Sequence, residues 1–116
     1  MLGEGPFSAR LHGILEYVAG GACILAPVVL DFDTPGAVAV SIGAGLAILV
    51  VAATSVGPMG LTREVAPPIH VVLDLLIALV LIVAPFIAGF ADQLVPSIFL
   101  IALGVALLLV TIGTRF

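Results

Sequence analysis

Two pairs of ionisable residues are the side chains in this sequence best suited to chemistry. His12 and Glu16 are four positions apart, and His70 and Asp74 repeat that spacing 58 positions later. Residues four apart on a helix share one face. Each pair therefore predicts an imidazole and a carboxylate side by side on a helix. Two such faces brought together would form a buried polar cluster.

Several kinds of chemistry are open to these four residues. We expect them to face one another inside a helical bundle, hydrogen-bonded and without a metal or other cofactor. Two imidazoles and two carboxylates also suit zinc, iron or manganese. A further alternative is a haem held between His12 and His70, since axial histidines on two helices are a familiar arrangement. The same groups would also serve an oligomeric permease for protons or a small solute.

The composition places the elements that position these residues in a membrane. Of the 116 residues, 63% are hydrophobic and 9% are charged, whereas a soluble domain has about 25% charged residues. A chain this short cannot bury so much apolar surface within itself. The basic residues are three Arg with no Lys, which is no basic stripe for nucleic acid. The single cysteine, Cys23, is expected to be a small buried hydrophobe.

Long apolar runs in the sequence predict membrane-spanning helices. Each run has about 18–22 residues, enough at 1.5 Å per residue to cross the ~30 Å hydrocarbon core. The runs are continuous rather than alternating, which excludes transmembrane strands. We therefore predict an all-α membrane protein with four transmembrane helices in one domain, 1–116. The predicted spans are Leu11–Leu30, Ala37–Val56, Ile69–Phe90 and Val95–Ile112.

The turns between these runs carry helix start and stop signals. Thr34 is predicted to cap the second helix, with Pro35 at its first position. Pro27 and Pro85 lie close to the ends of the first and third helices, which they are expected to kink or to end.

The chain is predicted to consist of two repeats, 11–56 and 69–113. Besides the His/acid pairs, Ala26-Pro27 matches Ala84-Pro85 at the same 58-residue shift. Each repeat is one helical hairpin, and two helices bring the chain back to the same side of the membrane. The repeats should therefore be parallel and related by a pseudo-two-fold axis along the membrane normal.

Two tandem hairpins with a proline signature late in each first helix resemble the SPW-repeat family of small bacterial integral membrane proteins. The resemblance covers nearly the whole chain. The Ser-Pro-Trp of the family stands here as Ala26-Pro27-Val28 and Ala84-Pro85-Phe86. The resemblance implies a membrane location and carries no assigned activity with it.

Small residues follow two faces of the second predicted helix. Such ladders let helices approach closely, either within one protein or between copies. We expect both ladders to serve internal packing. They are Ala37, Ser41 and Gly45, and Ala39, Gly43 and Ala47.

The charges outside the spans predict an orientation. With four spans, Arg10, Arg63 and Arg115 fall on one side of the membrane, and the aspartates of the short turns fall on the other. Because Lys and Arg accumulate in cytoplasmic segments, both termini are expected in the cytoplasm. The aspartates concerned are Asp31, Asp33 and Asp92.

The sequence contains no catalytic signature. It has neither a glycine-rich phosphate loop nor a Ser-His-Asp order, and its turns are short. The predicted function is therefore a non-enzymatic accessory or interaction protein of a bacterial plasma (inner) membrane. Its expected surroundings are the lipid bilayer and either further copies of itself or another membrane protein.

Overall fold

The computed structural model describes residues 5–115, and this part of the chain forms four helices and one pair of short strands. All four helices are long and apolar enough to cross a membrane. The prediction of an all-α, four-helix membrane protein is therefore confirmed. The helices are α1 (Ala9–Val29), α2 (Pro35–Thr54), α3 (Pro67–Ile87) and α4 (Leu94–Ile112).

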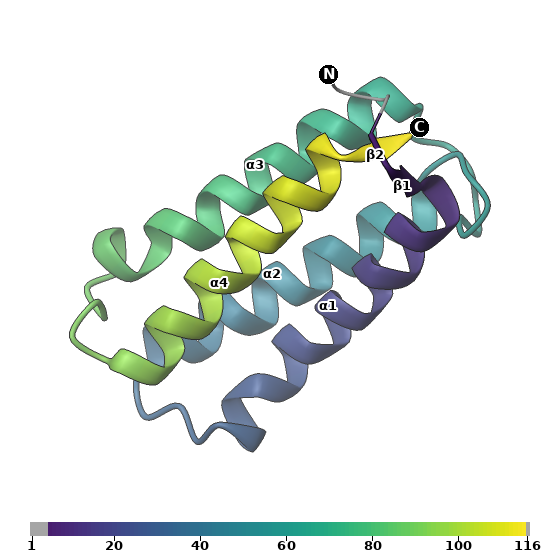
Figure 1. The fold of residues 1–116 in the computed structure, drawn as a ribbon. Coiled ribbons are helices and arrows are strands. Elements are labelled where there is room, and N and C mark those ends of the chain that lie inside the picture. Colours follow the sequence, from purple (N-terminus) through teal and green to yellow (C-terminus); the bar gives the residue numbers. More distant parts are fainter. Residues whose placement is uncertain (1–4, 116) are drawn as a thin grey trace.

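The helices form two hairpins, which we call the first hairpin (α1 and α2) and the second hairpin (α3 and α4). The start of α1 and the end of α4 lie at the same end of the bundle as the connection from α2 to α3 (Figure 1). Arg10, Arg63 and Arg115 are exposed at that end. The short turns with the exposed aspartates Asp31 and Asp92 are at the opposite end.

Within each hairpin the two helices pack closely together at a glycine. A Cβ added at Gly45 would lie 2.6 Å from the carbonyl oxygen of Gly20. One added at Gly104 would lie 2.9 Å from the carbonyl oxygen of Ala78. Gly20 and Ala78 are 58 positions apart, and Gly45 and Gly104 are 59 apart. The same close packing therefore occurs once in each hairpin.

The two small-residue ladders of α2 have different surroundings. Ala37, Ser41 and Gly45 are buried, as expected for internal packing. The second ladder, by contrast, is exposed on the outer face of the bundle, so its predicted internal role is wrong. One helix cannot turn both faces toward the partner of its own hairpin. The exposed residues are Ala39, Gly43 and Ala47.

Pro27 and Pro85 lie inside their helices, two residues before the last helical residue. Each carbonyl accepts a bond that closes the helix end: Phe32 N–H donates to Pro27 O at 3.0 Å, and Phe90 N–H donates to Pro85 O at 2.9 Å. Both phenylalanines are buried. The intervening residues, Asp31 (φ 55°) and Gly89 (φ 80°), are left-handed, as in a Schellman ending.

Helix starts differ from the prediction in one respect. Thr34 occupies the cap position of α2, with Pro35 following, but its side chain makes no capping hydrogen bond. At α1 the Ser8 side chain accepts from Leu11 N–H at 3.1 Å. Ser8 also belongs to β1 (Phe7–Ser8), which pairs in parallel with β2 (Thr114–Arg115).

Candidate functional site

The four predicted residues lie together between α1 and α3, and we call His12, Glu16, His70 and Asp74 the polar cluster. Each histidine is the fourth residue of its helix, and each acid follows one turn later. All four are buried, with exposed fractions between 0% and 6%. The spacing of four residues aims each pair inward, because residues i and i+4 share a face.

Two nitrogens and two oxygens of the polar cluster form a closed ring in which each nitrogen contacts both acids. His12 Nε2 lies 2.8 Å from Asp74 Oδ2 and 3.2 Å from Glu16 Oε1. His70 Nε2 lies 2.9 Å from both of these oxygens. The two imidazoles meet edge to face, with centroids 5.3 Å apart at 72°. Two of the four contacts, from His12 to Asp74 and from His70 to Glu16, cross between α1 and α3, so the ring joins the two hairpins.

Thr114 of β2 orients the His12 ring from the opposite side. Its Oγ1 lies 2.8 Å from His12 Nδ1, and its hydroxyl donates to the carbonyl of Val110. A hydroxyl has one proton, so Thr114 Oγ1 accepts from His12 Nδ1–H. The ring is therefore held with Nε2 directed at the two carboxylates.

Thr114 was not predicted from the sequence as part of the site, although the repeat contains a signal for it. Thr114 follows Ser55 by 59 positions, the shift that relates Gly45 to Gly104. Both hydroxyls donate to the carbonyl four residues earlier in their own helix, and Ser55 lines the cavity beside His70. Extending the repeat to the helix ends would have placed Thr114 and Ser55 next to the polar cluster.

One oxygen of each acid is left out of the ring. Among the described residues, Glu16 Oε2 and Asp74 Oδ1 are buried without a hydrogen-bond partner. Thr111 Oγ1 is 3.5 Å from the other Asp74 oxygen, Oδ2, which is the long limit for a hydrogen bond. Buried polar atoms without partners are uncommon, and an ion or water often accounts for them.

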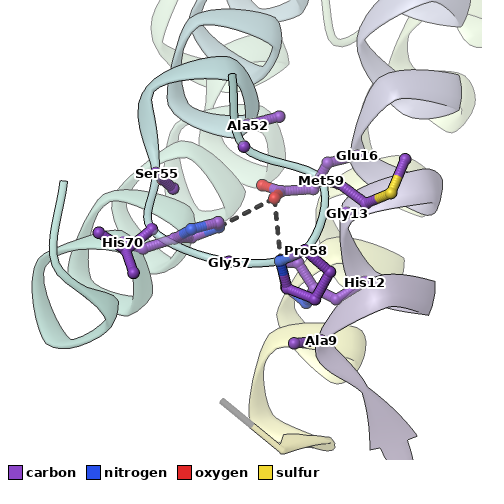
Figure 2. A pocket seen from close by; sticks show the side chains of 12 residues that line it. Ala9, His12, Gly13, Glu16, Ala52, Ser55, Gly57, Pro58, Met59 and His70 are labelled. Carbon is purple, nitrogen blue, oxygen red and sulfur yellow. Dashed lines mark hydrogen bonds and ion pairs between the residues drawn. The ribbon is translucent and has the colours of Figure 1, made fainter. Parts of the chain in front are cut away.

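A cavity of about 30 Å³ lies beside the polar cluster on the side of the α2–α3 connection. Figure 2 shows Glu16 between His12 and His70, with the connection passing over the cluster. Met59 packs where Gly13 leaves space, since a Cβ at Gly13 would lie 2.6 Å from Met59 Cβ. The Tyr17 hydroxyl donates to Met59 O at 2.9 Å. These contacts hold the connection over the cavity.

The arrangement suits a small cation better than a haem. Each member of the polar cluster offers one nitrogen or oxygen ligand atom, and the four atoms lie within 4.8 Å of one another. A haem between His12 and His70 would have to pass through the space that the Glu16 and Asp74 oxygens occupy. The carboxylates therefore argue against the haem alternative.

The other residues noted in the sequence, Cys23, Pro27 and Pro85, lie away from the polar cluster, toward the other end of the helices. Because Pro27 has no N–H, it leaves the carbonyl of Cys23 without its helical donor. Ser41 Oγ donates to that carbonyl at 2.6 Å. Cys23 itself is fully buried. Pro27 and Pro85 therefore serve the helix ends and not the site.

Comparison with known families agrees with this architecture. A family model described as the SPW repeat domain matches residues 10–114. The chain belongs to the SPW repeat family. No curated protein and no solved structure matches it. In this SPW repeat protein the matched region contains the four helices, except for the first residue of α1, Ala9, and every residue of the polar cluster.

Proposed function

We propose that this SPW repeat protein is a non-enzymatic accessory or interaction protein of the bacterial plasma membrane, acting through its lipid-facing helix surfaces. Its clustered ionisable residues are buried between the hairpins, with exposed fractions of 6% or less. The exposed surface of the spans is instead apolar, with Val28 at 83% and Ile87 at 81%. Such a surface contacts lipid and other membrane helices.

The observation that carries this proposal is an open apolar groove between α2 and α3. Its α2 side contains the exposed ladder Ala39, Gly43 and Ala47, and its α3 side contains Leu76 and Val80. Small residues let a second helix approach the backbone closely, which is the main source of helix association in lipid. The groove therefore favours binding to a helix of another copy or of another membrane protein.

Two matched glycine variants test this role. A Cβ at Gly43 or at Gly21 meets nothing within 4 Å, so Gly43→Leu and Gly21→Leu are both compatible with the isolated fold. Only Gly43 lines the groove. We expect Gly43→Leu to weaken association in lipid vesicles, measured by energy transfer between labelled copies, by on the order of tenfold. Gly21→Leu should behave as the unsubstituted protein does.

If copies of the chain do not associate with one another, the same variants test whether the groove binds a different membrane protein. Crosslinking in the native membrane should then yield one adduct of defined mass with the unsubstituted protein and with Gly21→Leu. That adduct should be lost with Gly43→Leu. Equal crosslinking of both variants would refute the groove as the interaction surface.

The proposal includes an orientation with both termini in the cytoplasm, because the three exposed arginines lie at that end. Asp33→Cys and Gln93→Cys, each in a Cys23→Ser background, place a thiol in the turns at the other end. Both should react with a membrane-impermeant maleimide in intact cells. Reaction only after permeabilisation would reverse the orientation.

A further inference from the structure

We propose that the polar cluster is a binding site for one divalent transition-metal ion, with zinc as the best-matched ion. The ligands are His12 Nε2, His70 Nε2, Glu16 Oε1 and Asp74 Oδ2, which form the ring described above. This site is independent of the groove, so a failure of the interaction proposal leaves it standing.

The spacing of the ring fits an ion at its centre. The four nitrogen–oxygen edges are 2.8, 2.9, 2.9 and 3.2 Å. Zinc bonds of about 2.0–2.1 Å in tetrahedral geometry place neighbouring ligand atoms about 3.3 Å apart. These four nitrogen–oxygen distances therefore need to lengthen by only a few tenths of an ångström to hold a zinc ion.

Hydrogen bonding around His12 also prepares it as a ligand. Thr114 Oγ1 accepts from Nδ1–H, as its own proton goes to Val110 O. A neutral His12 held in this way presents the Nε2 lone pair to the carboxylates. Lone pair and carboxylate repel each other unless a positive charge lies between them. Metal-binding histidines usually donate their second N–H in this manner.

The charge of the cluster is balanced by a divalent ion. Two carboxylates carry two negative charges, and buried charges need compensation. One divalent cation with two neutral imidazoles gives a neutral site. Two imidazolium ions would also balance the charge, but the second oxygens of Glu16 and Asp74 would stay without partners. A zinc ion that expands beyond four ligands can take such a second oxygen, because a carboxylate can bind a metal through both of its oxygens.

A small cavity beside the site and the depth of the site in the bundle suit an ion that arrives from the aqueous side. The cavity of about 30 Å³ touches His12, Glu16 and His70 beneath the α2–α3 connection, and it has room for a water molecule. At 1.5 Å per residue, the histidines lie only about 5 Å from the helix starts. An ion could therefore reach the site without crossing the hydrocarbon core.

The ligand set selects among ions. Imidazole and carboxylate together suit zinc and neighbouring first-row ions, whereas magnesium and calcium prefer oxygen ligands alone. Cys23, the single cysteine, is fully buried in the bundle. It does not appear in the group of ligand atoms that forms the site.

Zinc binding to the purified full-length protein in lipid nanodiscs tests the proposal. After chelator treatment and addition of zinc chloride, we expect about one zinc ion per chain, with magnesium and calcium failing to compete. X-ray absorption should show nitrogen and oxygen neighbours and no sulfur. A sulfur neighbour, or substoichiometric zinc in protein of native helicity, would overturn the site.

Matched variants locate the ion. Asp74→Asn keeps the shape of the side chain but removes its charge, and it should lower the zinc affinity by about 100-fold. The control Asp33→Asn changes an exposed acid at the other end and should leave the affinity unchanged. Thr114→Val should lower it by about tenfold, because Thr114 orients His12 without binding the ion.

The conservative variant Thr114→Ser separates a positioning role from a packing role. It keeps the hydroxyl that accepts from His12 Nδ1 and should restore most of the affinity lost in Thr114→Val. Circular dichroism of each variant establishes that the helices are intact. Equal affinity of Asp74→Asn and the unsubstituted protein, both with native helicity, would refute the assignment.

Discussion

The two hairpins share the polar cluster at one end and differ at the other end in how they accommodate a proline. In both, a proline near the end of the first helix leaves the carbonyl four residues earlier without its helical donor. In the first hairpin this carbonyl belongs to Cys23, and Ser41 donates to it. In the second hairpin the carbonyl belongs to Leu81, and the position that matches Ser41 is Leu100. Leu100 is buried, and its side chain has no hydrogen-bond donor.

The hairpins share the polar cluster but not the serine–carbonyl bond, because the contacts of the cluster cross between the hairpins and the serine–carbonyl bond does not. Each acid of the polar cluster touches histidines of both hairpins, so a change in either hairpin disturbs the whole ring. The bond from Ser41 to Cys23 lies within the first hairpin alone. It can change without consequence for the other half. The cluster therefore defines what the two halves must have in common.

Removing an acid from the polar cluster should have the largest effect on stability. Asp74→Ala and Glu16→Ala should each lower the free energy of unfolding by about 3 kcal/mol, because each leaves two buried imidazoles without a shared carboxylate. Unfolding in mixed micelles, followed by circular dichroism, measures this. The exposed Asp92 provides the control Asp92→Ala, which should change stability by less than about 0.5 kcal/mol.

The same pair of variants tests whether the halves are equivalent. Similar losses for Asp74→Ala and Glu16→Ala are expected, since each acid contacts one histidine of each hairpin, at 2.8 and 2.9 Å for Asp74 and at 2.9 and 3.2 Å for Glu16. A loss confined to one of the two acids would show that the ring is not shared.

The close approaches at glycine should give the next largest effect, and here the hairpins should differ. At Gly45 an added Cβ would meet the Gly20 carbonyl oxygen at 2.6 Å, and at Gly104 the Ala78 carbonyl oxygen at 2.9 Å. Backbone atoms cannot yield as a side chain does. Gly45→Ala should therefore cost about 3 kcal/mol and Gly104→Ala about 1 kcal/mol.

The measurement is again unfolding in micelles, with Gly21→Ala as the control because a Cβ there meets nothing within 4 Å. A larger loss for Gly104→Ala than for Gly45→Ala would contradict the order expected from the two Cβ–oxygen distances.

The bond from Ser41 to the Cys23 carbonyl should contribute about 1 kcal/mol, a typical net value for a buried hydrogen bond. Ser41→Ala removes the donor and should lower stability by that amount. In a Pro27→Ala background, residue 27 regains an N–H that can satisfy the carbonyl. The same Ser41→Ala change should then cost less, and the double-mutant cycle measures the difference. An equal loss of stability in both backgrounds would show that the contribution of Ser41 does not depend on the N–H missing at Pro27.

Much of the fold follows from the sequence because lipid imposes strict conditions on it. Backbone polar groups must be satisfied within each span, so long continuous apolar runs can only be helices. The observed α2, Pro35–Thr54, starts and ends two residues before the predicted run Ala37–Val56. The turn between the first two helices was found from Pro35, whose fixed φ suits a helix start.

The polar cluster could be predicted only in part. The four-residue spacing predicted that His12 and Glu16 share one helix face. The repeat predicted that this pair meets the corresponding pair, His70 and Asp74, inside the bundle. The contact of Thr114 with His12 depends on the short pairing of β1 with β2. That pairing could not be predicted, because strands of two residues are too short to show an alternating pattern in the sequence. Both ladders of α2 were predicted to face inward, and the sequence could not show that only one does, because both Gly43 and Gly45 are small and only tertiary contacts distinguish them.

The smallest expected effect concerns the starts of α1 and α3, where the hairpins differ in one side chain. Ser8 caps α1 through Leu11 N–H, and the matching residue of α3 is Ala66, 58 positions later. The backbone is alike at the two sites, with φ −75° and ψ 157° at Ser8 and φ −67° and ψ 151° at Ala66. Ile69 N–H already donates to the Ala66 carbonyl at 3.0 Å, so a serine placed there should offer this N–H a second acceptor through its side chain.

Ala66→Ser should raise the free energy of unfolding by about 0.5 kcal/mol, the low end for a cap, because Ala66 is exposed to solvent. The reciprocal change Ser8→Ala should lower it by a similar amount, and the two together should leave stability near its original value. Ala66→Gly is the control, since it changes the backbone without adding an acceptor. Protection of the Ile69 amide from hydrogen exchange should rise in Ala66→Ser alone. No gain in protection would mean that Pro67 at the first helical position already fixes the start of α3, and that the two helices begin by different means.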